Sequence, residues 1–339
     1  MSVFNTSVSG GGAKFTLTVS ATSGAQVTAS KGDKVVSGTS TNGEAVLVLP
    51  EAGEWTVSGT LNGQAFGSVT VEVVGDYTAA LTFVDSVLNN NDWSTISEVS
   101  DAGTGANYWA IGDRKQVTLN GTVGSLSLSN FSTYAFIIGF NHNSSREGNN
   151  RIHFQIGKTA LSGGKDICLV SGYSDDSDFY MNTSSTNAGG WEDSYMRNNI
   201  LGTSKTSYSG RFIGVLPSAL RNVLKSVTKY TDNTGNSSTS SGAVTATTDY
   251  AFLLSEYEVF GSCTYSNTNE ASRQQQYAYY AAGNTKIKYN YSSTGSAITW
   301  WLRSPYRSNS TNFVIVGTNG SVHFSIASRS LGVAPGFCV

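Results

Sequence analysis

Few side chains in this sequence combine the types and spacing that metal or acid–base chemistry needs. His142, His153 and Asp166 offer two imidazoles and a carboxylate, all zinc-ligand types, but their spacing matches no metal-binding motif. Glu192 and Asp193 are adjacent carboxylates, and we interpret them as residues that complement the dipole at a helix start, not as a general acid and base. We therefore expect neither a metal site nor an enzymatic activity.

The sequence gives little support for a calcium site or for thiol chemistry. Three closely spaced aspartates resemble a calcium loop, although no closing glutamate follows at the spacing of an EF-hand: Asp175, Asp176 and Asp178. Three cysteines are too far apart for a zinc or redox motif, and we interpret them as buried thiols: Cys168, Cys263 and Cys338. A disulfide between the last two stays open. The sequence contains no nucleophile elbow, P-loop, zinc-protease motif or dinucleotide fingerprint.

Recognition through hydrogen bonds and aromatic contacts is indicated near the C-terminal end. A tryptophan pair at 300–301 leads into the polar loop 306–312. In recognition loops Tyr and Arg anchor a ligand, while Ser and Asn adapt to it by hydrogen bonding. An ordinary solvated loop is the alternative interpretation. We predict a ligand-contact surface that consists of Tyr306, Arg307, Ser308, Asn309, Asn312, His323, Ser325 and Arg329.

The large side chains around this loop are interpreted as structural. A buried tryptophan contributes a large apolar area, and a buried arginine needs a carboxylate or carbonyl partner. Asp113 and Glu256 are the candidate partners of Arg303. The residues predicted to be structural are Trp109, Trp191, Trp300, Trp301 and Arg303.

The elements that hold these residues fall into two parts. Residues 1–80 have the pattern of a small all-β sandwich, because apolar and polar residues alternate from Phe15 to Ser20 and turn signals recur at short intervals. The Asn-Gly pairs at 42–43 and 62–63 favour type I′ hairpins, since both residues tolerate positive φ. We place the domain boundary within 75–88.

Helices and strands mix beyond the boundary, which predicts an α+β domain over 85–339. Helices are predicted after Asp92, after Pro217, at a capping box formed by residues 255–258, and over 270–282. Surface loops are predicted at 141–150, 171–190 and 231–249, where Asn, Ser, Thr and Gly dominate.

A hairpin is predicted close to the C-terminal end. Strands over 313–316 and 321–326 flank the turn Thr318-Asn319-Gly320. The period-2 rule places Ser321, His323 and Ser325 on the outer face of the second strand. The inward-facing residues would be Val322, Phe324 and Ile326.

Composition narrows the class of protein. Of the 339 residues, 39% are apolar, which is enough for a sizeable core, and only 13% are charged. The formal net charge is −2 and no basic run occurs, which argues against a nucleic-acid partner. No apolar stretch approaches the roughly 18 residues of a membrane span. The first residues lack the features of a secretory signal, so we expect accumulation in the cytoplasm and release by lysis.

Several motifs occur in the order seen in an uncharacterised domain family of Firmicutes and their phages. The chain resembles this family from about residue 90 to its end, most clearly in the W-W-L-R-S-P motif at 300–305. One departure is Ala334-Pro335, where Arg-Pro is commoner, and Arg329 is a candidate substitute for that arginine. The other matching segments are 108–113, 139–142, 190–197, 216–229, 252–258 and 332–337.

The resemblance implies a fold and a role. It implies a C-type-lectin-like domain over 85–339, fused to a module over 1–80 that resembles Ig-like or transthyretin-like domains. A phage virion protein, in a tail, baseplate or head fibre or a capsid decoration, would dock through the N-terminal module and attach to a bacterial surface glycan or protein. Tail adhesins suggest a homo-oligomer, such as a trimer, and lectin-like folds sometimes bind Ca²⁺. The alternatives are a purely structural virion decoration without a ligand, a cysteine-dependent oxidase and a bacterial surface protein.

Overall fold

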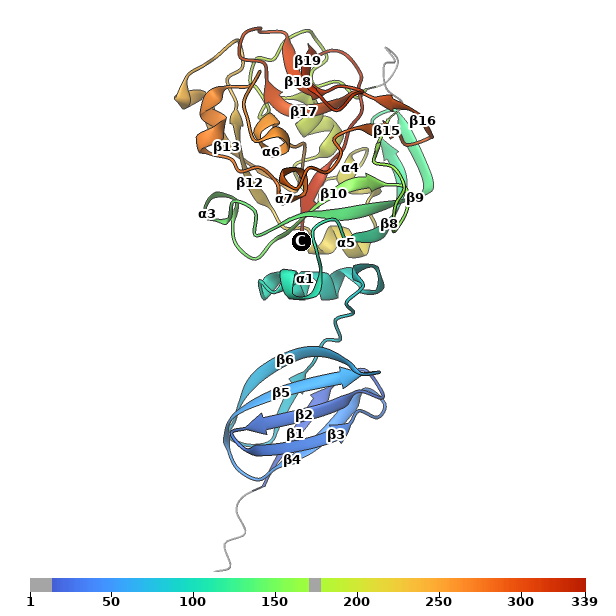
Figure 1. Cartoon of the computed structure of the whole chain (residues 1–339), viewed down its shortest axis with the longest axis vertical. Coiled ribbons are helices and arrows are strands. Elements are labelled where there is room, and N and C mark those ends of the chain that lie inside the picture. The colour runs from blue at the N-terminus through green and yellow to red at the C-terminus, as the bar shows by residue number, and fades with distance from the viewer. Residues whose placement is uncertain (1–13, 171–177) are drawn as a thin grey trace, which may run out of the picture. The chain divides into compact units, whose positions relative to one another are not determined.

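The computed structural model describes residues 14–170 and 178–339 (Figure 1). The chain divides into two compact units, Met1–Ser86 and Val87–Val339, and this boundary lies within the range 75–88 that the sequence indicates. Strands account for 40% of the structure and helices for 17%, in several separate sheets. The protein is therefore mostly β, with helices concentrated in the second unit.

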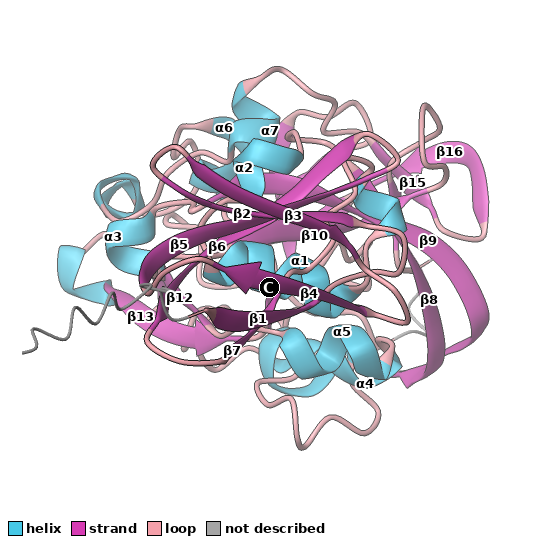
Figure 2. Cartoon of the chain, turned by 90° about the horizontal axis from the view of Figure 1, so that it is seen from below, coloured by secondary structure: helices cyan, strands magenta, loops and turns pink. Residues whose placement is uncertain are grey.

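The described part of the N-terminal unit contains seven strands in two sheets (Figures 1 and 2). One sheet has the order β4-β1-β7, with β1 antiparallel to β4 and parallel to β7. The other has the order β3-β2-β5-β6 and is antiparallel. The strands are β1 (Phe15–Ser20), β2 (Gln26–Lys31), β3 (Lys34–Thr39), β4 (Glu44–Leu49), β5 (Gly53–Leu61), β6 (Gln64–Val73) and β7 (Tyr77–Ala80).

The core of this unit comes from the alternation that the sequence shows. Leu17 and Val19 are fully buried on one face of β1, and they share a single apolar cluster with Trp55 of β5. Both residues of each Asn-Gly pair have positive φ, and the pair at 62–63 joins β5 to β6 as a two-residue hairpin. The predicted type I′ turn signals are thus confirmed.

The larger unit is organised around a five-stranded sheet of order β14-β20-β10-β9-β8. Its second strand, β20, is formed by the end of the chain and lies between β14 and β10, so the last residues are part of the core. The strands are β8 (Arg114–Val123), β9 (Leu126–Phe140), β10 (Ile152–Lys158), β14 (Ala251–Phe252) and β20 (Gly336–Cys338).

Three smaller sheets complete the β structure of this unit (Figure 1). The first contains β11 (Ile167–Cys168), β15 (Lys288–Asn290) and β16 (Ser293–Ile298). The second pairs β12 (Val227–Asp232) with β13 (Val244–Asp249). The third has the order β17-β18-β19, from β17 (Trp300–Pro305), β18 (Asn312–Val316) and β19 (Val322–Ile326).

The helices of this unit are short. α1 begins after Asp92 as predicted and buries Ile96 and Val99, although the Asp92 side chain makes no capping hydrogen bond. The α-helices are α1 (Trp93–Asp101), α2 (Gly105–Tyr108), α3 (Ser144–Glu147), α4 (Phe212–Val215), α5 (Ser218–Val223), α6 (Glu256–Phe260) and α7 (Ala278–Ala281). The 3₁₀ and π elements are η1 (Leu88–Asn90), η2 (Met196–Leu201), η3 (Ser241–Ala243) and η4 (Thr268–Ser272).

Two helix predictions are wrong in extent. The helix after Pro217 ends at Val223, and Val227 already belongs to β12, where the run Val-Thr-Lys-Tyr-Thr suits a strand paired with β13. The predicted helix 270–282 is broken into η4 and α7. Buried Glu270 accepts hydrogen bonds from the Asp232 amide and the Ser304 hydroxyl, and such tertiary contacts outweigh helix propensity.

Two predicted loops also contain regular structure. The segment 141–150 includes α3, and 231–249 ends in β13. In the remaining predicted loop, 171–190, residues 171–177 lie outside the described residues, and these include Asp175 and Asp176. The predicted capping box is confirmed: the Ser255 hydroxyl accepts from the Glu258 amide, and the Glu258 carboxylate accepts from the Ser255 amide.

Candidate functional site

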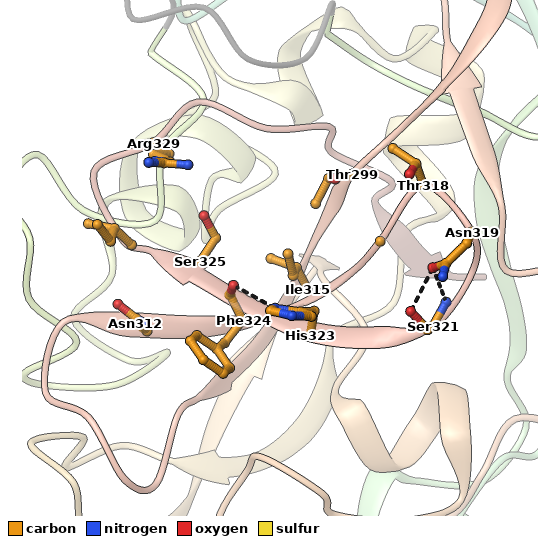
Figure 3. Close-up of a pocket in the computed structure, with 12 residues that line it drawn as sticks. Thr299, Asn312, Ile315, Thr318, Asn319, Ser321, His323, Phe324, Ser325 and Arg329 are labelled. Atoms are coloured by element: carbon orange, nitrogen blue, oxygen red, sulfur yellow. Dashed lines mark hydrogen bonds between the residues drawn. The ribbon is translucent and has the colours of Figure 1, made fainter.

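The predicted C-terminal hairpin is present and carries a surface hollow. Its strands β18 and β19 pair with Ile315 opposite His323 and Asn312 opposite Ile326. Gly320 has φ +80°, which allows the tight turn, and the Asn319 side-chain oxygen accepts from both the amide and the hydroxyl of Ser321 (Figure 3). The hairpin is thus a rigid support for the side chains on it.

A hollow of about 640 Å³ opens on this support, and we call it the hairpin hollow. It includes four of the predicted contact residues, Asn312, His323, Ser325 and Arg329. Four of the other eight lining residues carry a small hydroxyl or amide, namely Thr299, Thr318, Asn319 and Ser321 (Figure 3). Hydroxyls and amides both donate and accept hydrogen bonds, so the lining suits a ligand that does the same.

An aromatic cluster adjoins the hollow through Phe324. The ring of Phe324, which lines it, stacks on Tyr306 with centroids 4.4 Å apart. Tyr265 meets both rings edge to face, at 5.2 Å from Phe324 and 5.5 Å from Tyr306. The three rings are half-buried, and His323 beside them is exposed. An apolar platform therefore adjoins the polar lining.

Side-chain hydrogen bonds to backbone carbonyls hold the loop 306–312 in place. Asn187 is fully buried, and its side-chain amide donates to the carbonyls of Tyr306, Asn309 and Asn312 at 3.3, 2.8 and 2.8 Å. The Arg307 guanidinium donates to the carbonyl of Cys263 at 3.4 Å. The loop is therefore preorganised, which lowers the entropy cost of binding.

The other predicted contact residues are placed differently. Tyr306 stacks on Phe324 but does not line the hollow, and the Asn309 side-chain oxygen accepts from the amide and hydroxyl of Thr311. Arg307 and Ser308 are not part of the lining of the hairpin hollow.

The predicted inward and outward orientation of the β19 side chains is wrong at the end of the strand. Ser325 is only 8% exposed, whereas Ile326 is 36% exposed. The turn that follows β19, closed by the Arg329 amide on the carbonyl of Ile326, places Arg329 on the same side of the strand as Ser325 (Figure 3). β19 is also an edge strand, so its two faces are covered unevenly.

The predicted structural side chains are buried. The indole N–H of Trp300 donates to the Lys286 carbonyl and that of Trp301 to the Phe179 carbonyl. The Trp191 indole donates to the Asp249 carboxylate, and Trp109 is 3% exposed. These contacts connect β17 to distant parts of the unit.

The predicted partners of Arg303 are wrong. Its guanidinium binds Glu258, with nitrogen–oxygen distances of 2.5 and 2.9 Å. Glu258 lies two residues after Glu256 in α6, and at 3.6 residues per turn the two side chains leave opposite sides of the helix. Glu256 instead accepts from three successive amides, those of residues 264–266, and so fixes the position of Tyr265 beside the hairpin hollow. Asp113 accepts from the Ala110 amide.

A buried ionic cluster occupies the interior of the same unit, and sequence reasoning did not find it. The Lys229 ammonium donates to Glu147 at 2.6 Å, Glu258 at 3.0 Å and the Tyr277 hydroxyl at 2.7 Å. We use the name buried ionic cluster for these residues together with Arg303, His142 and His153. All of them are at most 5% exposed.

Electrostatics determines the charge states in the cluster. Burial raises the pKa of Glu147 to about 7. Burial alone would also raise the pKa of Glu258, but the charges of Arg303 and Lys229 hold it well below its usual range. Burial, followed by the charge of Lys229, lowers the pKa of His142 to about 3, so this histidine is neutral at pH 7.

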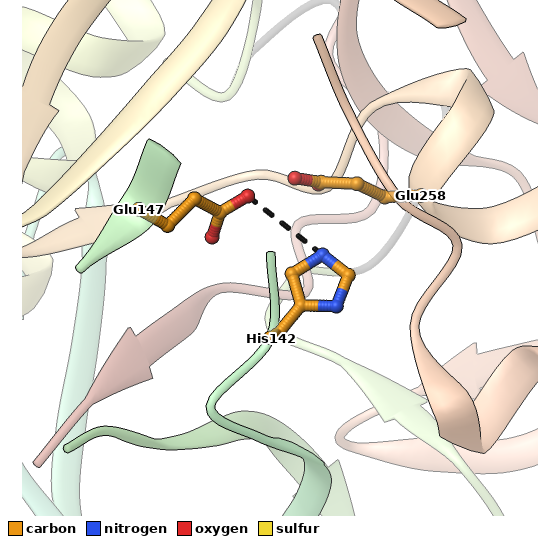
Figure 4. A group of neighbouring side chains, drawn as sticks. All are labelled: His142, Glu147 and Glu258. Carbon is orange, nitrogen blue, oxygen red and sulfur yellow. Dashed lines mark ion pairs between the residues drawn. The ribbon is translucent and has the colours of Figure 1, made fainter. Parts of the chain in front are cut away.

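The cluster has a ligand set for a metal. His142, Glu147 and Glu258 each place one ligand atom within 4.8 Å of the others (Figure 4). The Lys229 ammonium, however, already contacts both carboxylates and supplies the cationic charge there. Asp166, which the sequence offers as a third ligand beside His142 and His153, pairs with Lys158 instead.

The three cysteines are free, so the Cys263–Cys338 disulfide is not formed. Burial raises the pKa of each thiol to about 12, which leaves them protonated at neutral pH.

Glu192 and Asp193 precede the π element η2 within a turn, close to the predicted helix start. No helix in residues 14–170 and 178–339 is long and apolar enough to cross a membrane.

Residues 166–339 match a family described as a domain of unknown function, DUF6273. The chain belongs to this family. No curated protein and no solved structure matches the chain. All residues of the hairpin hollow lie within the family segment, whereas Glu147 and the two histidines of the buried ionic cluster precede it.

Sequence reasoning missed part of the site. Tyr265 and Asn187 lie in polar stretches that give no periodic signal, and Thr299 precedes the tryptophan pair without any motif of its own. Phe324 was predicted as a core residue from its alternation, and its half-buried ring in fact belongs to the surface.

Proposed function

We propose that the C-terminal unit is a non-catalytic binding module and that the hairpin hollow binds a carbohydrate of a bacterial surface. The observation that carries the proposal is the combination of a half-buried aromatic platform, at Phe324, with a lining of hydroxyls and amides on a rigid hairpin. A sugar ring has an apolar face of C–H groups and an edge of hydroxyls, so both features find a counterpart in such a ligand.

The placement of the titratable groups supports binding over catalysis. The carboxylates and histidines whose pKa is shifted by burial, such as Glu147, His142 and Glu270, lie buried inside the fold. A general acid or base must reach the substrate within hydrogen-bonding distance. In the hairpin hollow the polar groups are mostly hydroxyls and amides, which hold a ligand without activating it.

The proposal extends to the whole protein. We propose an Ig-like N-terminal module, supported by two sheets between which the chain crosses after β1, β3, β4 and β6, as in Greek-key sandwiches. We propose a C-type-lectin-like second unit in a homo-oligomeric phage virion protein that attaches to the host. The motifs shared with the phage-associated family support this role, and many copies would add avidity to shallow contacts.

Binding of the fluorescently labelled full chain to a panel of Firmicute cells tests the proposal. The double variant His323→Ala, Arg329→Ala removes two exposed side chains from the hairpin hollow. We expect saturable binding to at least one strain, weakened at least tenfold in this variant. Lys165→Ala, which removes an exposed cation from another surface, serves as the control and should bind as the unmodified chain does.

Competition identifies the ligand class. Glycans released from the bound strain should displace the protein, whereas protease treatment of the cells should leave binding intact. Binding abolished by protease and unaffected by the glycans would replace the carbohydrate with a protein receptor. Absence of binding to every strain by folded protein would favour a structural decoration without a ligand.

A further inference from the structure

A second polar hollow lies next to the hairpin hollow. Its volume is about 310 Å³, and we call it the η2 hollow because Asn199 of η2 lines it. Its other walls come from the segment that contains Asn182 and Ser184, and from Asp193 and Tyr195. Both hollows are open to the surface of the same unit.

Only a thin wall of chain separates the two hollows. The amide of Asn182, which lines the η2 hollow, donates to the carbonyl of Ala327 at 3.1 Å. Ala327 directly follows Ile326, a lining residue of the hairpin hollow. The hydroxyls of Ser185 and Ser328 lie 3.0 Å apart across the same wall. The hollows are therefore neighbours held in a fixed relation by hydrogen bonds.

The η2 hollow repeats the chemistry of the hairpin hollow. Tyr195 lines it and packs against Tyr180 with ring centroids 4.9 Å apart, and both rings are half-buried. Beside this aromatic pair, Ser184, Asp193 and Asn199 expose a hydroxyl, a carboxylate and an amide. A carboxylate accepts hydrogen bonds and an amide both donates and accepts them, which matches the hydroxyl edge of a sugar.

We infer that the two hollows are consecutive subsites for one extended ligand, a chain of several sugar units. The inference rests on the proposed function and adds the ligand's length to it. Two aromatic platforms with polar linings, separated by one wall of chain, suit a polymer that contacts both at once. A single sugar unit occupies one of them, so affinity rises with chain length once both are reached.

A glycan array carrying one-, three- and six-unit forms of bacterial surface sugars tests this with the full chain. Tyr195→Ala removes the aromatic ring that lines the η2 hollow, and Ser184→Trp fills the hollow. We expect each variant to bind six-unit glycans roughly threefold to tenfold more weakly, as loss of one aromatic contact predicts, and to bind single units unchanged. Ser145→Trp, exposed on α3, is the control for an added tryptophan.

The outcomes separate the two proposals. If Phe324→Ala weakens binding but neither η2 variant changes its dependence on chain length, the extended site is overturned and the hairpin hollow stands. Equal weakening for one-unit and six-unit glycans by the η2 variants also overturns it. If no glycan is bound, or if Phe324→Ala leaves binding unchanged in a folded protein, the proposed function itself fails. Melting curves of all variants exclude misfolding.

Discussion

Glu258→Gln is the sharpest test of how the C-terminal unit is held together. Glu258 accepts from the Arg303 guanidinium through both oxygens, from the Lys229 ammonium at 3.0 Å and from the Ser255 amide at 3.0 Å. Glutamine is nearly isosteric but has one acceptor oxygen, and its NH₂ group would face cationic donors. The substitution therefore leaves Arg303 and Lys229 buried with too little negative charge.

The magnitude follows from burial. Breaking a fully buried ion pair by removing one partner costs about 3–5 kcal/mol, because the remaining charge stays desolvated. All three side chains are fully buried, so solvent screening is small. For a unit of this size about 1 kcal/mol corresponds to roughly 2–4 °C, which predicts a fall in melting temperature of roughly 6–20 °C.

Differential scanning calorimetry of the full chain measures this effect. Glu192→Gln removes an exposed carboxylate from the same unit and should shift the transition by less than about 2 °C. A shift that small for Glu258→Gln would refute the reasoning, since it would mean that the two cations do not depend on this carboxylate.

Three further predictions concern pH, the loop and a glycine. The pKa of Glu147 is raised from 4.5 to about 7, so between these pH values the folded state holds a proton that the unfolded state has lost. The free energy of unfolding should therefore fall as the pH rises from 4.5 to 7, and it should fall less in Glu147→Gln, which has no proton to lose. Denaturant titrations at several pH values measure this. Asn187→Ala removes one donor from each of three loop carbonyls and should speed hydrogen exchange in 306–312 at least tenfold while the N-terminal unit is unaffected. Gly190→Ala should lower the melting temperature sharply, because its φ is +55° and a Cβ would lie 2.0 Å from the Asp232 carbonyl oxygen; an unchanged transition would contradict this.

Local patterns in the sequence predict much of the fold. The alternation of β1, the two Asn-Gly turns, the capping box at Ser255 and the C-terminal hairpin all depend on residues close in the chain. Each is confirmed. The two helix predictions failed in extent where distant contacts decide, as at Glu270, which binds the Asp232 amide 38 residues away.

The buried ionic cluster could not be predicted for the same reason. Lys229 meets Glu147 across 82 positions and Arg303 meets Glu258 across 45, and no spacing rule connects them. Half of the predicted contact residues do line the hairpin hollow, because a hairpin fixes its own side-chain order. Tyr265 joins them through the tertiary contacts of Glu256, which no local pattern indicates.

The most direct test of the central claim is a hydrogen-exchange footprint of the full chain with and without glycans released from a bound Firmicute strain. We expect slower exchange in residues 312–329 when the glycans are present, with little change in residues 14–86. Unchanged exchange in 312–329 at saturating glycan, or slowing confined to another surface, would contradict the assignment of the hairpin hollow as the binding site.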